Sequence, residues 1–286
     1  MTDSKKFDLI VIGGGPGGYV GAIRASQLGK KVAVIEKENL GGVCLNWGCI
    51  PTKALLRAAE LKQNISHLGE FGIDIKGEIE INLERVVARS RKVAQRLSGG
   101  VSHLMKKNKI SVFNGVAKIE KKTPIGWQIA VSEKSDLFLE APNILLATGA
   151  RAKQISGVEV DEDKIVTYRD AMVPKTMPKS LLVIGSGAIG IEFASFYNDM
   201  GVDVTIIEAL DRILNVEDKE ISEIAHKSFE KRGIKIHTSA KIESISKSEK
   251  EVTSTITVAG FSDSTSSMFH YYDQVTYFED NNFKTE

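Results

Sequence analysis

Residues 7–36 read FDLIVIGGGPGGYVGAIRASQLGKKVAVIE. A short apolar run is followed by a glycine-rich segment, a helix-forming stretch and a second apolar run. Short apolar runs beside glycine are typical of buried strands, and the periodic stretch between them favours a helix. We therefore expect a strand at 7–12, a helix at 16–28 and a strand at 32–35.

The same order of segments recurs about 170 residues later. An apolar run at 181–184 precedes the glycines of residues 185–190, and a helical stretch to about residue 200 leads to a second apolar run at 204–207. Two such β–α–β units on one chain are typical of doubly wound sheets. The sequence therefore predicts an α/β fold with two doubly wound, Rossmann-like dinucleotide-binding domains.

The segment between the two units predicts a small β insertion in the first domain. Residues 83–107 have the pattern of a long helix, and residues 111–139 alternate short strands with turn signals at Asn114–Gly115 and Pro124–Gly126. Residues 143–147 then resume a buried strand. The expected parts are a first domain at 1–149 with the insertion at about 111–140, a second domain at 150–260 and an atypical tail at 261–286.

Length and composition limit the class of protein. The 286 residues carry a net charge of +1 and 42% are hydrophobic, and no long basic block occurs, so neither nucleic acid nor an anionic membrane is expected as a partner. The N-terminal residues lack the apolar region of a signal peptide, which predicts a cytoplasmic protein. Cys44 and Cys49 are the two cysteines, too few for a four-cysteine zinc site or a disulfide-stapled secreted scaffold, and no metal is expected.

The first glycine-rich segment fits the pattern G-x-G-x-x-G at a strand-to-helix junction. We expect Gly13 to allow the tight turn, Gly15 to leave room for a pyrophosphate, and Gly18 to let the helix pack on the strand. Glu36, at the end of the second strand, can accept hydrogen bonds from ribose hydroxyls. The alternative is a glycine-rich turn without a ligand. The β–α–β context and the position of Glu36 at the end of the second strand argue against this alternative.

The second glycine-rich segment repeats this pattern. Glu208 stands eighteen residues after its last glycine, as Glu36 does after the first segment. A carboxylate at this position accepts from the free 2′-hydroxyl of NAD and repels the 2′-phosphate of NADP. The sequence therefore predicts NAD here. The expected turn contacts are Gly185, Gly187, Ala188, Ile189 and Gly190.

Residues 41–56 read GGVCLNWGCIPTKALL and carry both cysteines. Four residues separate Cys44 from Cys49, a spacing that allows a small disulfide loop, and a helix beginning near Cys49 would favour its thiolate. Lys53 would lie on the same helical face, where its ammonium could stabilise negative charge on a thiolate or a reduced flavin. Two nearby cysteines in a cytoplasmic protein are otherwise often inert buried residues.

This cysteine segment resembles the active-site signature of the pyridine nucleotide–disulfide oxidoreductases. Within that superfamily, CLNWGCIPTKALL is similar to the dihydrolipoamide dehydrogenases rather than to glutathione or mercuric reductases, whose segments typically read CVNVGCVP. The resemblance runs from about Phe7 to Thr257. It implies FAD at the first turn and NAD at the second.

The resemblance also implies roles for matched residues in the chemistry. Cys44 would be the thiol that exchanges with a dithiol substrate, and Cys49 the charge-transfer thiol beside the flavin. Lys53 would lie near flavin N5 and pair with Glu192. On the residues alone, a solvent-facing role is the common one for a helical glutamate.

Other matched positions are expected to contact the cofactors. Gly42 is expected to contact the cofactor of the first turn. Gly115 and Ala117 match a family position near the adenine. Thr148–Gly149 match the end of a strand near the flavin. Ile242 matches a position near the adenine of NAD. An ordinary strand-terminating turn at Thr148 and simple core packing of Ile242 are the alternatives.

The activity implied by the resemblance is oxidation of dihydrolipoamide by NAD, through FAD and a Cys44–Cys49 disulfide. The implied partners are the lipoyl domains of 2-oxo acid dehydrogenase or glycine cleavage complexes, and the family is typically homodimeric. A non-catalytic fragment that binds FAD and NAD, or a disulfide reductase acting on another thiol, are the alternatives.

The sequence departs from the family pattern near residue 260. The Gly-Asp dipeptide of the family's second flavin-contacting segment does not occur, and none of the five histidines matches its acid–base position, so a C-terminal truncation with impaired activity is expected. Residues 261–286 hold seven of the seventeen Phe and Tyr residues. A frame disruption, a truncated product and a genuine terminus stay open as explanations of this tail.

Overall fold

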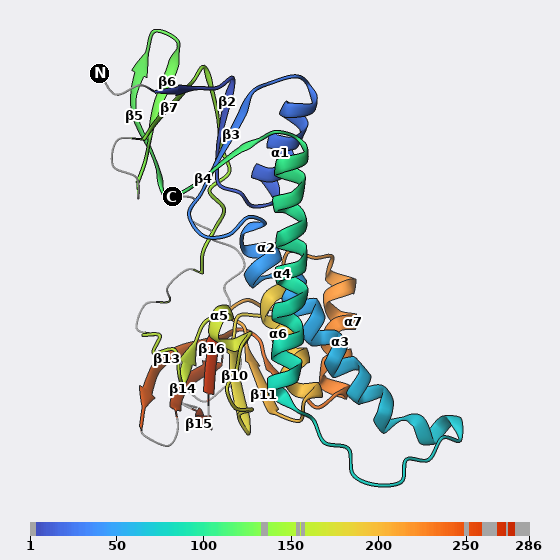
Figure 1. Cartoon of the computed structure of the whole chain (residues 1–286). Coiled ribbons are helices and arrows are strands. Elements are labelled where there is room, and N and C mark those ends of the chain that lie inside the picture. Colours follow the sequence, from blue (N-terminus) through green and yellow to red (C-terminus); the bar gives the residue numbers. More distant parts are fainter. Residues whose placement is uncertain are drawn as a thin grey trace. The chain divides into compact units, whose positions relative to one another are not determined.

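The computed structural model of the chain describes residues 4–132, 137–152, 155, 158–248, 252–258, 268–272 and 274–277. For residues 255–258, 268–272 and 274–277 it describes the backbone alone. Two compact units make up the chain, the first mainly of Met1–Pro51 and Ser90–Ala150 and the second of Thr52–Arg89 and Arg151–Lys284 (Figure 1). Both are built on parallel sheets with helices, so the α/β class expected from the sequence is confirmed.

A four-stranded parallel sheet forms the centre of the first unit, in the order β4-β3-β2-β8. The strands are β2 (Leu9–Ile12), β3 (Val32–Glu36), β4 (Ser111–Asn114) and β8 (Asn143–Leu146). Helix α1 (Pro16–Gln27) connects β2 to β3 and begins at a proline, whose fixed φ suits the first turn of a helix. The carboxyl ends of the parallel strands meet at one edge of the sheet, where doubly wound folds bind ligands.

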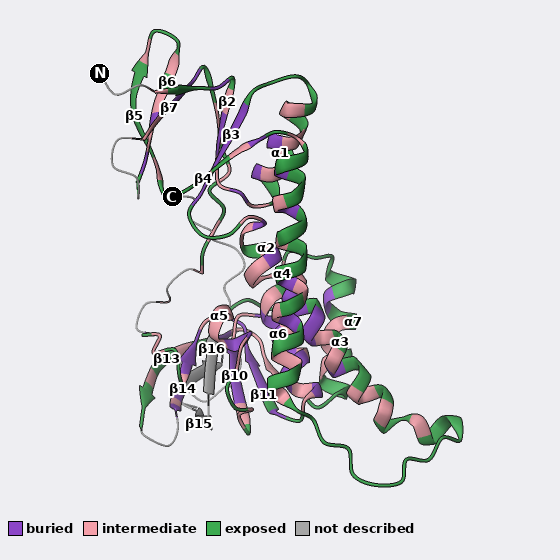
Figure 2. Cartoon of the chain, in the orientation of Figure 1, coloured by how far each residue is buried: buried purple, intermediate pink, exposed green. Residues whose placement is uncertain are grey.

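The two faces of this sheet pack against different elements, because successive residues of a strand point to opposite sides. Val11 faces a core shared with α1, α2 (Gly42–Trp47) and the part of α4 (Leu83–Lys107) that carries Val101. Ile10 faces the other side and packs against a smaller sheet. In Figure 2 the inner strands of the parallel sheet are accordingly buried.

The smaller sheet of the first unit has the order β1-β7-β6-β5. Its strands are β1 (Lys5–Lys6), β5 (Ala117–Thr123), β6 (Gly126–Val131) and β7 (Phe138–Ala141). The insertion thus begins after β4, later than the expected residue 111, because β4 pairs with β3 in the main sheet. The pairing of β1 with β7 was not predicted. The expected burial of β8 is wrong, because β8 is the outer strand of its sheet and Leu146 is 64% exposed.

The second unit contains a five-stranded parallel sheet in the order β12-β11-β10-β16-β9. The strands are β9 (Ile165–Val166), β10 (Ser180–Ile184), β11 (Asp203–Ile207), β12 (Lys235–His237) and β16 (Gln274–Tyr277). Helix α6 (Ala188–Asp199) packs on β10 and β11 and buries Phe193, Phe196 and Tyr197. The second β–α–β unit is therefore present where the sequence predicted it.

Further elements complete the second unit. A three-stranded antiparallel sheet in the order β13-β14-β15 is formed by β13 (Ala240–Lys247), β14 (Val252–Val258) and β15 (Met268–Tyr272). The helices are α3 (Cys49–Ser66), the short η1 (Leu68–Phe71), α5 (Tyr168–Ala171) and α7 (Lys219–Lys231). Ala240 and Val252 join Leu182 and Ile207 of the parallel sheet in one core cluster.

Two backbone segments of the tail expected at 261–286 take part in these sheets. Strand β15 pairs with β14, and β16 lies between β10 and β9 rather than at a sheet edge. Residues 261–267, 273 and 278–286 lie outside the described residues.

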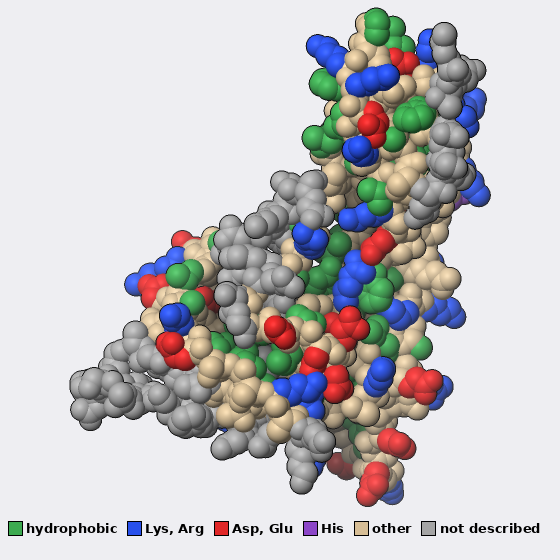
Figure 3. Space-filling view, turned by 90° about the vertical axis from the view of Figure 1, so that its left-hand side faces the viewer, with side chains coloured by type: hydrophobic (Ala, Val, Ile, Leu, Met, Phe, Trp, Pro, Cys, Tyr) green, Lys and Arg blue, Asp and Glu red, His purple; other side chains and the backbone are tan. Residues whose placement is uncertain are grey.

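The described helices and the surface in Figure 3 show how hydropathy and charge are distributed. None of the described helices combines the length and apolar character needed to cross a membrane. On the face shown in Figure 3, acidic and basic side chains are interspersed, as the near-zero net charge leads one to expect.

Candidate functional site

The first glycine turn, between β2 and α1, has the shape that a dinucleotide turn requires. Gly13 has a φ of +101°, and a Cβ there would lie 2.1 Å from the Ala147 carbonyl oxygen. A Cβ at Gly18 would lie 1.8 Å from the Gly13 oxygen, so α1 approaches β2 closely. The nearest described atom to a Cβ at Gly15 would be the Gly42 Cα at 3.7 Å, which is an ordinary van der Waals distance. The space beside the uncapped start of α1 therefore fits a pyrophosphate.

Glu36 is buried at the end of β3 and is held by two backbone donors. The Gly14 N–H donates to its Oε2 at 2.6 Å, and the Glu38 N–H donates to its Oε1 at 2.8 Å. A carboxylate has about four acceptor positions, so two stay available for ribose hydroxyls. Gly115 donates its N–H to the Glu36 carbonyl at 2.9 Å, and Thr148–Gly149 follow β8 at the same edge of the sheet.

The second glycine turn, between β10 and α6, repeats this geometry. Gly185 has a φ of +94°, and a Cβ at Gly190 would lie 2.1 Å from the Gly185 oxygen. Glu208 is buried at the end of β11, where the Leu210 N–H donates to its Oε1 at 2.9 Å. Both the N–H of Ser186, at 3.0 Å, and its hydroxyl donate to Glu208 Oε2. The hydroxyl contact was not predicted from the sequence.

The cysteine pair follows directly on the first turn. Gly42 begins α2, and a Cβ on it would lie 2.7 Å from the Gly15 Cα. Gly48 ends α2 and packs so closely that a Cβ on it would lie 3.2 Å from the Cys44 Cα. Helix α3 begins at Cys49, as the sequence predicted. Cys44 is half-buried and Cys49 is exposed. Their disulfide stays a prediction for the oxidised protein.

Lys53 and Glu192 form an ion pair within the second unit. Lys53 lies in α3, one helical turn after Cys49, and Glu192 lies in α6, just after the second glycine turn. The Lys53 side chain is 62% exposed, and ion pairs in such surroundings contribute little to stability. The pair therefore serves to orient two charged side chains rather than to hold the fold.

The remaining residues that are expected to contact a cofactor lie on described strands and helices. Ala117 opens β5, and Ala188 and Ile189 open α6 directly after the second turn. Ile242 lies on β13 and packs against a core cluster that includes Ile207. Ile242 therefore packs against the core, and its contact with adenine stays a prediction.

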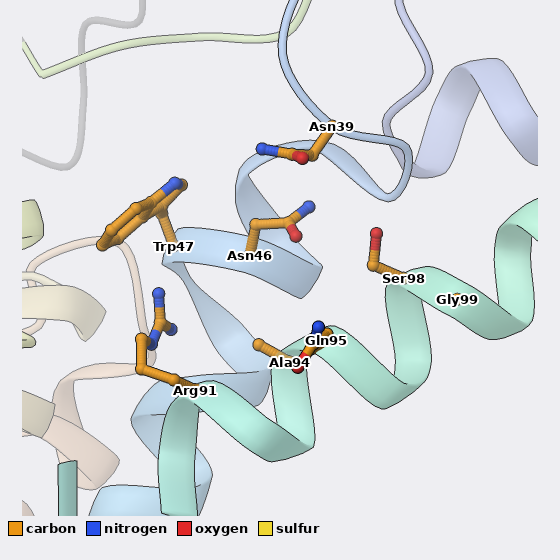
Figure 4. Close-up of a pocket in the computed structure, with 8 residues that line it drawn as sticks. All are labelled: Asn39, Asn46, Trp47, Arg91, Ala94, Gln95, Ser98 and Gly99. Atoms are coloured by element: carbon orange, nitrogen blue, oxygen red, sulfur yellow. The ribbon is translucent and has the colours of Figure 1, made fainter. Parts of the chain in front are cut away.

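A cavity of about 310 Å³ lies beside α2 in the first unit. Figure 4 shows Trp47 projecting from α2 and Arg91 rising from α4 beneath it. The Arg91 guanidinium carbon lies 4.5 Å from the centre of the Trp47 ring, a cation–π contact, and burial lowers the pKa of Arg91. The other lining residues are Asn39, Asn46, Ala94, Gln95, Ser98 and Gly99. No pattern in the sequence indicates this contact, because helical periodicity does not say which residues a helix packs against.

The chain matches a known family over most of its length. Residues 7–269 match the pyridine nucleotide-disulphide oxidoreductases. The chain is 49% identical over 266 residues to a dihydrolipoyl dehydrogenase of Rhizobium etli, covering 87% of this chain and 54% of that protein. It is 48% identical over 250 residues to a dihydrolipoyl dehydrogenase of Zymomonas mobilis, covering 87% and 53%. The chain thus spans about half the length of the curated relatives it matches.

Solved structures agree with this assignment. LpdA from Mycobacterium tuberculosis is similar with a TM-score of 0.82 and 25% identity, covering 94% of this chain and 58% of that one. The HOCl-induced flavoprotein disulfide reductase RclA from Escherichia coli is similar with a TM-score of 0.74 and 25% identity, covering 94% and 55%. The resemblance expected from the cysteine segment is confirmed. The chain belongs to the pyridine nucleotide-disulphide oxidoreductase family.

Proposed function

We propose that this chain acts as a flavin-dependent disulfide oxidoreductase that oxidises dihydrolipoamide with NAD through Cys44 and Cys49. The observation that carries the proposal is the close contact of Gly42 with Gly15, which joins the start of the cysteine segment to the first dinucleotide turn. The curated relatives named dihydrolipoyl dehydrogenase support the choice of substrate.

We assign FAD to the first turn, in a domain of residues 1–149, and NAD to the second turn, in a domain of residues 150–260. The space beside Gly15 and the acceptor positions of Glu36 support a dinucleotide at the first turn. The carboxylate of Glu208 supports NAD rather than NADP at the second, because it would repel a 2′-phosphate.

The chemistry that the chain itself supplies lies at the two sulfurs. A substrate thiolate attacks the Cys44 sulfur of the disulfide, a mixed disulfide forms, and Cys49 leaves as a thiolate. The second substrate thiolate then attacks the substrate sulfur of the mixed disulfide, which closes the ring of lipoamide and releases the Cys44 thiolate. The substrate loses two electrons and its two thiol protons; the cysteine pair gains the electrons, and the protons pass to solvent.

Charges around the pair support the reduced state. Cys49 is the first residue of α3, so its sulfur lies at the positively polarised end of the helix dipole. The Lys53 ammonium lies one turn further along the helix and is oriented by Glu192. Bound FAD would supply the electron transfer between the cysteine pair and a nicotinamide, which side chains cannot carry out.

The partners we propose are lipoyl domains of 2-oxo acid dehydrogenase or glycine cleavage complexes, with a second copy of the chain as in a homodimer. A cytoplasmic location accompanies this proposal, since a reducing compartment suits two accessible thiols.

The test is the visible absorption spectrum of the purified chain before and after addition of dihydrolipoamide. We expect a flavin spectrum that loses intensity and gains a long-wavelength charge-transfer band. Cys49→Ser should abolish that band, whereas Cys44→Ser should retain a thiolate next to the flavin. Glutathione in place of dihydrolipoamide should leave the spectrum unchanged.

Two results would count against the proposal. One is a purified chain that neither contains nor takes up flavin. The other is full alkylation of both cysteines under air without reductant, because the pair would then not form its disulfide.

A further inference from the structure

Gly14 and Ser186 occupy the same place in the two glycine turns. In the first turn the Gly14 carbonyl accepts the Gly41 N–H at 2.8 Å, and in the second the Ser186 carbonyl accepts the Leu214 N–H at 3.1 Å. The N–H of each donates to Oε2 of the acid that ends the following strand. The two turns therefore share one backbone hydrogen-bond pattern.

The turns differ in the number of donors to that acid. Among the residues that the structure describes, Glu36 accepts two hydrogen bonds, both from backbone N–H groups. Glu208 accepts three, because the Ser186 hydroxyl also donates to Oε2. Ser186 is 1% exposed and Glu208 is 8% exposed, so water competes little for this contact. With about four acceptor positions on a carboxylate, Glu208 keeps one, on Oε1.

The hydroxyl is not needed to orient the carboxylate. Glu36 is held in the corresponding arrangement by backbone donors alone. A side chain at Gly14 would also be crowded, because its Cβ would lie 2.7 Å from Leu40 Cδ2 and 3.1 Å from Glu36 Oε2. The serine is therefore a distinct feature of the second turn, and its effect is to fill an acceptor position.

We propose that Ser186 sets the affinity of the second site by competing with a ribose hydroxyl for Oε2 of Glu208. This inference rests on the proposed binding of NAD at the second turn. A ribose at Glu208 then has one acceptor position, whereas a ribose at Glu36 has two. The weaker hold suits a dinucleotide that must leave in every turnover, and the stronger hold suits a cofactor that stays bound.

Substitution of Ser186 tests this proposal directly. Ser186→Ala removes the hydroxyl and keeps the backbone donor, so the Kd for NADH should fall roughly three- to tenfold, the effect of one added hydrogen bond. Ser186→Gly reproduces the first turn and should act in the same direction. Binding of NADPH should stay weak in both variants, because the carboxylate of Glu208 stays in place.

The matched control is Ser195→Ala, which deletes a hydroxyl on helix α6, the helix that follows the second turn. The Ser195 Oγ accepts from the Arg232 guanidinium at 2.9 Å, and Ser195 lies eight residues after Gly187 in sequence. Its loss should leave the Kd for NADH unchanged. In a Glu208→Ala background, Ser186→Ala should also have no effect, because the shared acceptor is gone.

The measurement is calorimetric titration of the full chain with NADH and with NADPH, with thermal unfolding to verify that each variant folds. Tighter NADH binding in both Ser186 variants, absent in the Glu208→Ala background, supports the proposal. An unchanged or weaker Kd in the folded Ser186 variants overturns this inference alone. Failure of the unaltered chain to bind NADH overturns the proposed second site and this inference with it.

Discussion

At the scale of single residues, the turns depend on glycines where a helix meets a strand. A Cβ at Gly18 would lie 1.8 Å from the Gly13 oxygen, and one at Gly190 would lie 2.1 Å from the Gly185 oxygen. Both contacts are with backbone, which cannot rotate away as a side chain can. Any larger residue must therefore push the helix off the sheet.

The variant Gly18→Ala should lower the free energy of unfolding. We expect a loss of about 1–3 kcal/mol, the usual cost of overpacking, because α1 must shift from β2. Urea denaturation followed by circular dichroism measures this change.

Gly17→Ala is the control for that variant. Gly17 lies in the same turn of α1, and a Cβ there would meet the Ala147 Cβ at 3.9 Å, in ordinary contact. Since alanine favours helix over glycine, this variant should be neutral or more stable by up to about 1 kcal/mol. Equal losses in the two variants would contradict the role given to Gly18.

At the scale of elements, the short helix α2 depends on its contact with α4. A helix of six residues is too short to be stable alone, and Trp47 of α2 stacks on Arg91 of α4. Cys44 lies on the same short helix. The Trp47–Arg91 contact therefore helps to hold the thiol in place.

Arg91→Met should loosen α2 while keeping an apolar stem beneath Trp47. The half-buried thiol of Cys44 should then be alkylated several-fold faster under reducing conditions, since a contact of about 0.5–2 kcal/mol is lost. Rates are measured by mass spectrometry after timed iodoacetamide treatment. Gln95→Ala, on the same cavity, should leave the rate unchanged, and an unchanged rate in Arg91→Met would refute the dependence of α2 on this contact.

The turn before β9 depends on Asp161. Its Oδ1 accepts the N–H groups of Asp163 at 3.0 Å and of Lys164 and Ile165 at 2.8 Å, and its Oδ2 forms an ion pair with Lys247. Burial raises the pKa of Asp161, but these hydrogen bonds together outweigh burial and lower the pKa to about 2. The unfolded carboxyl titrates near 3.9. Its stabilisation is therefore complete above that pH and is lost as the pH falls through about 2.

Asp161→Asn should destabilise the chain at pH 7 by about 1 kcal/mol, allowing for solvent screening. The difference from the unaltered chain should shrink as the pH is lowered from 4 towards 2, where the native carboxyl is protonated as well. Urea denaturation at several pH values measures it. Glu162→Gln, an exposed change in the same turn, should show no such pH dependence, and a constant difference for Asp161→Asn would disprove the assignment.

The sequence predicted the elements whose contacts are local. Both β–α–β units were predictable because strand, glycine turn and helix lie within about 30 residues of chain. The pairing of β4 with β3, and the position of β16 between β10 and β9, join residues far apart in sequence and were missed. The pairing of Lys53 with Glu192 followed from family resemblance, not from the residues. Side-chain contacts such as that of Ser186 with Glu208 become visible only when the backbone is known.

At the scale of the whole molecule, the chain has two turns that are equivalent in backbone and separate in sequence. Gly15 has φ and ψ of −71° and −174°, and Gly187 has −68° and −177°. Any residue can adopt this extended conformation. The backbone conformation therefore does not require glycine at these two positions, and room for the proposed dinucleotides is the reason that we infer for it.

We expect Gly15→Ala and Gly187→Ala to have opposite effects on the binding of flavin and of NADH. A methyl group at Gly15 fits the fold, with its nearest described neighbour at 3.7 Å, but enters the space proposed for the FAD pyrophosphate. Gly15→Ala should therefore lose flavin and bind NADH normally, and Gly187→Ala should retain flavin and lose NADH. Both glycines are helix N-caps, where alanine is less favourable than glycine, so the free energy of unfolding without ligand should fall by no more than about 1 kcal/mol in either variant.

Flavin content from the visible spectrum and thermal unfolding with NADH give the two readouts. At a hundredfold excess over its Kd, NADH should stabilise the Gly15→Ala chain by about 2.7 kcal/mol and the Gly187→Ala chain hardly at all. The double variant should fold and bind neither ligand, because each substitution acts at its own turn. If Gly187→Ala lost flavin while keeping its NADH stabilisation, the assignment of the two cofactors to the two turns would be reversed. If either variant lost both ligands yet remained folded, the turns would not act as separate sites.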